Sequence, residues 1–261
     1  MTTRMLVLLA GAGFLAGQAT AQTVLFDFDS VPVYSPFPID VTVGGLTAHL
    51  SGTGSGYSIQ SSSTAPVAPV GFSGHYIYPS SVFAADLLVS FSETLTNFSI
   101  LYSPQELGCD DSARLKVTAY MNTTPVGTNT TTASSPGTWP VETLSITTVQ
   151  GFNNVVVHYD ARPPTCQDYG VIFLADNMSV ALAPPPIVLS NLTKLPNGAF
   201  QFGFTYAPGP TFSVFAATNI SLPMSNWTLL GGATGVVAGQ YQFTDAQATN
   251  HVQRYYRVRS P

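Results

Sequence analysis

The chain has very little charge. Only 8% of its 261 residues are Asp, Glu, Lys or Arg, whereas about a quarter are charged in an average soluble protein. Lysine occurs only at Lys116 and Lys194. This composition excludes a charge-laced helical bundle or coiled coil, and also a highly charged disordered chain. The formal net charge of −5 gives no basic footprint, so we expect no nucleic-acid partner.

Motifs for catalysis are also missing. None of the four His residues lies in the H-E-x-x-H or H-x-H spacing of a zinc hydrolase, and no G-x-S-x-G nucleophile elbow occurs. The glycine-rich segment Gly52–Gly56 lacks the following Lys and helix of a phosphate-binding loop. Glutamate is scarce, which leaves few candidates for the paired carboxylates of a glycoside hydrolase. The sequence therefore predicts no enzyme activity.

Long apolar runs are absent except at the N-terminus. Arg4 is followed by the apolar run Met5–Ala16 and then by the small-x-small pattern Ala19-Thr20-Ala21. These are the features of a secretory signal peptide. The run is shorter than the roughly 20 residues that span a bilayer. We therefore expect residues 1–21 to be a signal peptide, the mature protein to be secreted or at the cell surface, and no membrane span.

Cysteine is almost absent. The only two cysteines are Cys109 and Cys166, so one intramolecular pair is possible. Both lie in polar, loop-like settings, and export permits a disulfide. We predict a disulfide here, with two buried free thiols as the alternative. In the chain-entropy model, closing this loop stabilises the fold by roughly 4 kcal/mol.

A proline run divides the chain into two modules. Residues 183–186 (Ala-Pro-Pro-Pro) favour an extended polyproline II spacer between a module at 22–182 and a module at 187–261. The charge changes sign at this point: residues 22–183 contain twelve acids and three bases, and residues 184–261 contain one acid and four bases. We interpret this as two modules that have different partners or that contact each other.

Both modules have the pattern of β-strands. Short segments rich in Val, Ile, Thr, Tyr and Phe are separated by Gly, Pro, Asn and Ser, and the modules show no helical apolar stripe. The first module is expected to form strands at 24–29, 39–50, 86–92, 97–103, 113–121, 126–132, 142–148, 154–159 and 169–181. The second is expected to form strands at 187–192, 199–206, 212–218, 227–231, 240–244 and 253–259. The predicted fold class is all-β: a jelly-roll β-sandwich plus a smaller, immunoglobulin-like β-sandwich.

Sequence segments in both modules carry family resemblances. The first module has F-D-F-D-S from Phe26, A-R-L-K-V-T-A-Y-M from Ala113 and F-L-A-D-N-M-S-V from Phe173. Across residues 23–182 it resembles the galactose-binding-like jelly rolls of secreted bacterial proteins, which implies a glycan or cell-surface polymer as partner. The second module has F-S-V-F-A-A-T-N from Phe212 and Q-R-Y-Y-R-V-R-S-P from Gln253. It resembles a recurrent C-terminal domain of exported bacterial proteins, which implies a role in attachment or display.

Three acids are candidates for a structural calcium site. The first and last strands of such jelly rolls lie close together, so the resemblance implies that Asp27 or Asp29 approaches Asp176. Asp176 interrupts an apolar run, and a buried carboxylate is costly without a partner or a metal. Calcium prefers six to eight oxygen ligands, so a calcium ion held by these three residues is one hypothesis. Hydrogen bonds at a strand end, without a metal, are the alternative.

Two further groups are candidate ligand-binding residues. Polar loops on a rigid scaffold often bind ligands, and the loops around the predicted disulfide carry Glu106, Asp110, Asp111, Arg162 and Asp168. The alternative for them is a solvated, stapled loop pair. Sugar rings stack on flat aromatic faces, and aromatic residues in loop or strand-edge settings are Tyr76, Tyr78, Phe83 and Trp139. The alternative for these aromatics is an ordinary place in the core.

The sequence thus predicts an exported, non-catalytic two-domain β protein. The acidic jelly roll is expected to recognise a glycan or cell-surface polymer, and the basic module is expected to serve attachment or display. The competing class is a structural surface protein without a specific small ligand. A glycan-active hydrolase is a further alternative.

The disulfide prediction is tested on the exported protein by mass spectrometry. Alkylation without reductant should leave both cysteines unmodified, and alkylation after reduction should label two thiols, because a disulfide protects both sulfurs. Two alkylatable thiols in the unreduced, denatured protein would contradict the prediction.

Overall fold

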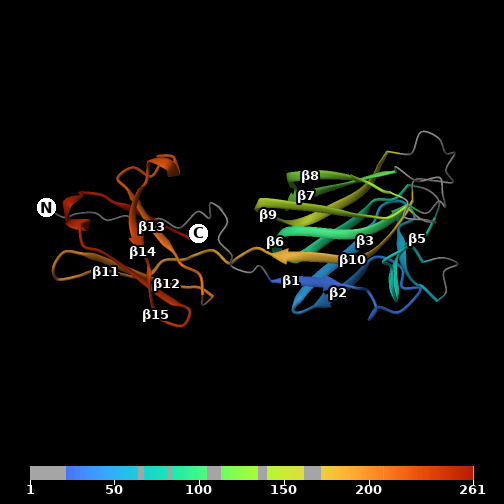
Figure 1. The fold of residues 1–261 in the computed structure, drawn as a ribbon, viewed down its shortest axis with the longest axis horizontal. Helices are drawn as coiled ribbons and strands as arrows, with labels where there is room; N and C mark the ends of the chain where they lie inside the picture. Colours follow the sequence, from blue (N-terminus) through green and yellow to red (C-terminus); the bar gives the residue numbers. More distant parts are fainter. Residues whose placement is uncertain are drawn as a thin grey trace. The chain divides into compact units, whose positions relative to one another are not determined.

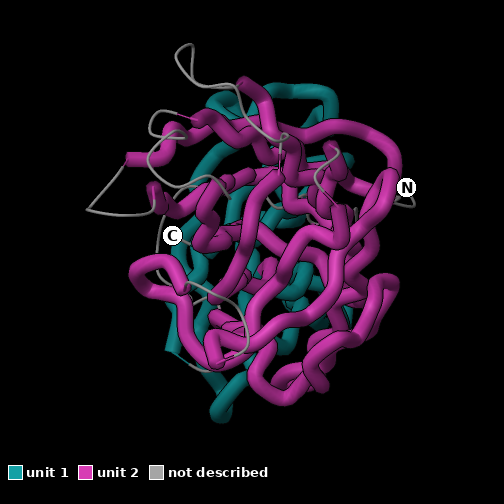
Figure 2. Tube along the Cα trace, turned by 90° about the vertical axis from the view of Figure 1, so that its right-hand side faces the viewer, with its two compact units in different colours: residues 1–21, 184–261 teal, residues 22–183 magenta. Residues whose placement is uncertain are grey.

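The computed structural model describes residues 22–63, 68–81, 84–104, 113–134, 140–161, 172–207 and 209–260 (Figure 1). Within these ranges the protein consists of antiparallel strands and two short 3-10 turns, η1 (Met224–Asn226) and η2 (Ala248–Asn250). The all-β fold class is therefore confirmed. The chain divides between Ala183 and Pro184 into an N-terminal unit and a C-terminal unit (Figure 2). In the described part, no helix is long and apolar enough to cross a membrane.

The described residues of the N-terminal unit contain ten strands. They are β1 (Thr23–Phe26), β2 (Ile39–Val43), β3 (Leu46–Gly52), β4 (Tyr57–Ser61), β5 (His75–Pro79), β6 (Leu87–Pro104), β7 (Arg114–Met121), β8 (Thr124–Thr132), β9 (Glu142–Ala161) and β10 (Phe173–Leu182). The hydrogen-bonded order is β4-β5-β10-β6-β9-β7-β8, and in addition β1 pairs with β10, β3 with β6, and β2 with β3.

Two long strands, β6 and β9, pair with each other on both sides of an irregularity near Leu95. Their register is regular up to Ser90↔Asn154 and from Asn97↔Thr147 onward, with shifts on both sides of Leu95. The first half of β6 pairs with β3, and its second half pairs with β10. Both halves bury alternate side chains in one core, for example Val89 and Ile100. The ladder therefore bends around a single core and forms a β-sandwich.

In strand β7, successive side chains point alternately into the core and toward the surface. Leu115, Val117 and Ala119 are fully buried, as their alternation with Arg114, Lys116 and Thr118 predicts. Burial of a Leu or Val side chain contributes about 1.5–3 kcal/mol. The core therefore fixes which face of β7 points outward.

Several strand boundaries differ from those expected. The segment 39–50 forms a hairpin of β2 and β3, because Gly44 and Gly45 adopt positive φ values of 57° and 86° that suit a tight turn. Strands β4 and β5 were not predicted. Strands β6 and β9 each span two expected segments. The residues between those segments form register shifts within one continuous strand and not a turn.

The C-terminal unit forms two small sheets in its described residues. One has the order β11-β12-β16-β15 and the other β14-β13-β17. The strands are β11 (Ser190–Lys194), β12 (Phe200–Thr205), β13 (Ser213–Ala217), β14 (Thr228–Gly232), β15 (Thr234–Val237), β16 (Gln240–Asp245) and β17 (Tyr255–Arg259). The expected strand at 187–192 lies at β11 instead, and β15 was not predicted.

One core joins the two small sheets. Phe200, Phe202 and Phe204 share the inner face of β12, as the period of two predicts. They belong to the same buried cluster as Tyr256 and Val258 of β17. This part of the chain is therefore a two-sheet β-sandwich.

A buried ionic network closes the C-terminal unit. The Asp245 carboxylate accepts hydrogen bonds from Arg254 Nη1 at 2.7 Å and from Tyr256 Oη at 2.8 Å. Asp245 and Arg254 are both buried, and burial followed by the bond to Asp245 raises the pKa of Tyr256. Removing one partner of such a pair leaves an uncompensated buried charge. Asp245 therefore serves to pair with Arg254 and Tyr256 in the core and is not available to surface charges.

Gly151 lies at the register shift between β6 and β9, which gives a stability prediction. Gly151 has a φ of 73°, and a Cβ added there would lie 2.7 Å from Thr94 Cγ2. We expect Gly151→Ala to lower the free energy of unfolding by about 1–3 kcal/mol, measured by calorimetry. Gly235→Ala is the control, because its added Cβ meets nothing within 4 Å and should change stability by less than about 0.5 kcal/mol. Equal effects of the two substitutions would contradict this role.

Candidate functional site

The outward-facing side of the β3, β6, β9, β7 and β8 strands forms one surface, which we call the open face. The register places Leu88 of β6 opposite Val156 of β9, and Val156 opposite Thr118 of β7. The next row across the same strands contains Ser90, Asn154 and Tyr120. All six side chains are partly exposed. The open face therefore carries an apolar row beside a polar row.

A pocket of about 370 Å³ hollows the open face at this position. Leu88 and Val156 line it together with Ser90, Asn154 and Tyr120. Asn122 and Thr123, from the turn between β7 and β8, line it as well. The pocket therefore offers apolar contact next to hydroxyl and amide groups.

A network of three asparagines holds one wall of the pocket. Asn122 has a φ of 55°, and its backbone N–H donates to Asn153 Oδ1 at 2.7 Å. Asn153 Nδ2 donates back to Asn122 Oδ1 at 3.0 Å. Asn154 Nδ2 donates to the Asn122 carbonyl at 3.1 Å and to Asn153 Oδ1 at 2.7 Å. These bonds fix the orientation of the Asn154 amide before any ligand binds.

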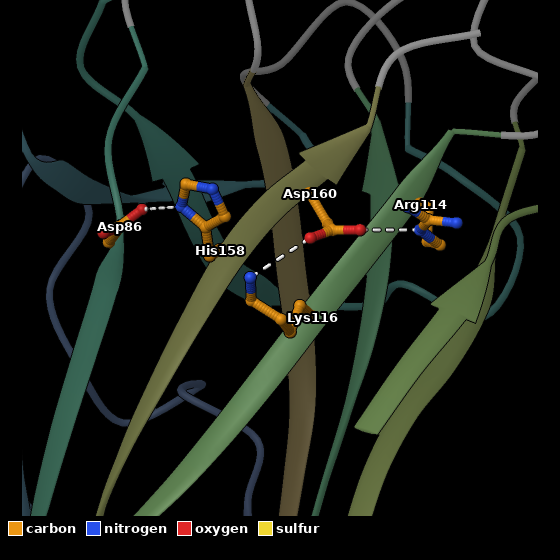
Figure 3. A network of polar contacts seen from close by, with 5 residues as sticks. All are labelled: Asp86, Arg114, Lys116, His158 and Asp160. Carbon is orange, nitrogen blue, oxygen red and sulfur yellow. Dashed lines mark hydrogen bonds and ion pairs between the residues drawn. The ribbon is translucent and has the colours of Figure 1, made fainter. Parts of the chain in front are cut away.

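Charged side chains lie beside the pocket on the same face, and Figure 3 shows that they are paired. His158 Nδ1 lies 2.5 Å from Asp86 Oδ1. The Asp160 carboxylate accepts hydrogen bonds from Arg114 Nε at 2.6 Å and from Lys116 Nζ at 3.1 Å. The hydrogen bond from Arg114, followed by that from Lys116, lowers the pKa of Asp160. With histidine counted as neutral, the two cations Arg114 and Lys116 balance the two carboxylates Asp86 and Asp160 at this end of the open face.

Sequence reasoning missed the open face. The alternation along β7 already placed Lys116 and Thr118 on an outward face. The partners of these residues come from β6 and β9, far along the chain, and only the strand register brings them together. No local spacing pattern could have identified the pocket.

The three candidate calcium ligands lie in one region. Asp27 Oδ1 accepts a bond from the Asp29 backbone N–H at 3.2 Å, and Asp29 Oδ1 accepts one from the His75 N–H at 2.7 Å. The Asp29 carboxylate occupies the space where a Cβ on Gly74 would stand. In the part of the chain that the structure describes, no group of three or more His, Cys, Asp or Glu side chains could hold a metal ion. Calcium stays a prediction of the sequence.

Asp176 is fully buried at an irregularity in β10. Its Oδ2 accepts a hydrogen bond from the Ser73 N–H at 3.1 Å, and its Oδ1 accepts one from the Asn177 N–H at 2.7 Å. Burial raises the pKa of Asp176 to about 7; these two bonds act to lower it, and the nearby Asp29 and Asp27 charges raise it further. These two hydrogen bonds from backbone N–H groups are what the metal-free alternative predicts for Asp176.

The aromatic candidates occupy core positions or lie outside the described residues. Tyr76 is fully buried with Phe72 and Leu174, and Tyr78 packs against this cluster half-buried. A ring without exposed surface cannot stack on a sugar, so Tyr76 has the core role that the sequence left open. The remaining candidates lie outside the described residues: Phe83, Glu106, Cys109, Asp110, Asp111, Trp139, Arg162, Cys166 and Asp168.

The raised pKa of Asp176 gives a pH-dependent stability. The unfolded carboxyl titrates near its ordinary pKa of 3.8, and the folded one titrates near 7. Between these values the folded state holds a proton that the unfolded state releases, so stability falls as pH rises. From pH 5 to pH 8 we expect wild type to lose a few kcal/mol relative to Asp176→Asn, measured by urea unfolding.

Equal pH profiles for the two proteins would contradict this assignment. The same titration with added calcium and with EDTA tests the calcium prediction. A bound calcium ion would hold the carboxylate ionised and abolish the loss of stability at high pH, with EDTA restoring it.

Comparisons with known proteins assign no family. No protein-family model and no curated protein matches the chain. Among solved structures, the K2 cleaved adhesin domain of Lys-gingipain is 12% identical, with a TM-score of 0.40, covering 62% of this chain and all of that chain. The K1 cleaved adhesin domain of Lys-gingipain from Porphyromonas gingivalis W83 is 13% identical, with a TM-score of 0.36, covering 62% of this chain and 99% of that chain.

A third structure contains two carbohydrate-binding modules. The CBM32-1 and CBM32-2 domains of ZmpB from Clostridium perfringens are 8% identical, with a TM-score of 0.27, covering 86% of this chain and 92% of that chain. At such values the likeness assigns no ligand, so the candidate site rests on the geometry of the open face.

Proposed function

We propose that this protein is an exported, non-catalytic binding protein whose open face takes an uncharged glycan or cell-surface polymer. The observation that carries the proposal is the pocket of about 370 Å³, which lies beside paired charges on the β-sheet. Export rests on the predicted signal peptide at residues 1–21, which would expose the open face to extracellular ligands.

A sugar ring has an apolar side and a polar edge, which match the apolar row and the polar row of the open face. A pyranose has apolar C–H faces and a rim of hydroxyl groups. The C–H face would pack on Leu88 and Val156, beside the ring of Tyr120. The hydroxyls would donate to Asn154 Oδ1, because both Nδ2 hydrogens of Asn154 are already used in the network, and would bond to the Ser90 hydroxyl, which both donates and accepts. Because the asparagine network already orients Asn154, binding would cost little side-chain ordering.

The charges of the open face favour an uncharged ligand. Asp160 is neutralised by Arg114 and Lys116, and Asp86 is bonded to His158. An ionic ligand would have to break one of these pairs, and this end of the face has no surplus charge to attract it. A neutral glycan displaces only water.

The same charges support binding in preference to hydrolysis. A glycosidase needs a carboxylic acid with a raised pKa to protonate the leaving group. On the open face the Asp160 pKa is lowered by its cationic partners, so this group holds no proton at neutral pH. The open face is therefore suited to hold a glycan, not to cleave it.

The proposal is tested on a glycan array with the mature full chain, followed by titration of the best neutral glycan. Asn154→Ala and Tyr120→Ala should each weaken binding by at least about tenfold, equivalent to about 1.4 kcal/mol. Tyr34→Ala is the matched control, because Tyr34 is a 65% exposed tyrosine that does not line the pocket. It should bind like wild type. All variants should stay folded, and only Asn154→Ala, which loses two hydrogen bonds, should lower Tm by a few degrees.

Two outcomes would overturn the proposal. Absence of glycan binding by the wild type would favour a purely structural surface protein. Binding that survives both pocket substitutions but is lost in Trp139→Ala would move the site to the loops that the sequence singled out.

A further inference from the structure

The C-terminal unit has arginines that its own acid cannot neutralise. Residues 184–261 contain a single acid, Asp245. Asp245 is buried and is already bonded to Arg254 and Tyr256. The structure shows no ion pair between Arg257 or Arg259 and any other described residue. Among the described residues of this unit, these two positive charges therefore have no acidic partner.

The two arginines lie side by side on one face of β17. Tyr256 and Val258 point into the core, so Arg257 and Arg259 point outward and are partly exposed. Residues two apart on a strand are separated by about 7 Å. On the neighbouring strand β13, Phe215 stands opposite Arg257 and Ser213 stands opposite Arg259. We call the surface formed by Arg257, Arg259 and Ser213 the arginine face.

Arg257 is held in place by an aromatic ring. Its guanidinium carbon lies 4.5 Å from the centroid of the Trp227 ring. Trp227 is itself buried, and its indole N–H donates to the Leu222 carbonyl at 3.0 Å. Arg257 Nη1 also contacts Met224 Sδ at 3.8 Å. Stacking occupies the flat side of a guanidinium and leaves N–H groups at its edge for an anion.

We propose that the arginine face binds an oxyanion, a carboxylate or sulfate group, carried by an acidic polysaccharide. A planar guanidinium matches the two oxygens of such a group with parallel N–H bonds. Ser213, which stands opposite Arg259 on β13, adds a hydroxyl donor. This site is independent of the open face and takes the opposite class of ligand.

The number of arginines distinguishes a polysaccharide from a membrane. Segments that bind anionic lipid surfaces carry clusters of about four to eight Lys or Arg. The C-terminal unit carries four in all, of which Arg254 is buried and paired, and Lys194 lies on β11 of the other sheet. One arginine held by an aromatic ring, with a second arginine two residues along the strand, suits a discrete anionic group better than a charged lipid surface.

The test measures binding of the mature full chain to immobilised dextran sulfate, polygalacturonate and uncharged dextran at about 50 mM salt, where ionic contacts are weakly screened. Wild type should bind at least one acidic polymer and not dextran. Arg257→Gln/Arg259→Gln should bind at least tenfold more weakly, and Arg259→Gln alone should bind at least threefold more weakly. Arg257→Lys keeps the charge but loses the planar fork, so it should also bind more weakly than wild type.

Lys194→Gln is the matched control, because it removes the same charge from the same unit. It should bind within twofold of wild type. Equal losses in Lys194→Gln and Arg259→Gln would show attraction to net charge alone and overturn the proposal. It would also be overturned if wild type bound neither acidic polymer. If the protein instead bound preferentially to vesicles containing an anionic phospholipid, and Arg259→Gln lost that binding, the ligand of the arginine face would be a membrane surface and not a polysaccharide.

Discussion

Burial of every second side chain along the β6–β9 ladder is the constraint on which the N-terminal unit depends. The core takes residues such as Val89, Val155 and Val157, and the pleat then forces their neighbours outward. Because the two strands are adjacent in register, these outward neighbours form rows and not isolated positions. The pocket is a direct consequence: Leu88, Val156 and Asn154 meet there because the core fixes the residues between them.

The same constraint explains how much the sequence could predict. Alternation of apolar and polar residues is local, so it correctly predicted the all-β class and both faces of β7. Hydrogen-bond register is not local. Tyr120 and Asn154 are opposite each other only because β7 and β9 pair, and nothing in either segment encodes that pairing. Glycines with positive φ stand both at the β2–β3 turn (Gly44 and Gly45) and at the irregularity opposite Leu95 (Gly151). The sequence alone did not show that the first site is a turn and the second a register shift within one strand.

Charge has a different role in each unit. In the N-terminal unit the paired groups of the open face cancel one another, and Asp176 is buried against backbone N–H groups. In the C-terminal unit the only acid in the sequence, Asp245, is buried and paired with Arg254. Arg257 and Arg259 therefore have no acidic partner among the described residues. Scarce charge thus leaves a charge-balanced open face on one unit and two arginines without an acidic partner among the described residues of the other.

The central claim is that the open face, and not the loops around the cysteines, receives the ligand of the N-terminal unit. The most direct measurement is NMR of the labelled mature chain titrated with a neutral glycan that it binds. The account predicts that shift changes concentrate at residues 118–123 and 153–158. Changes confined to residues 105–112 and 162–171, with the open face unaffected, would contradict it.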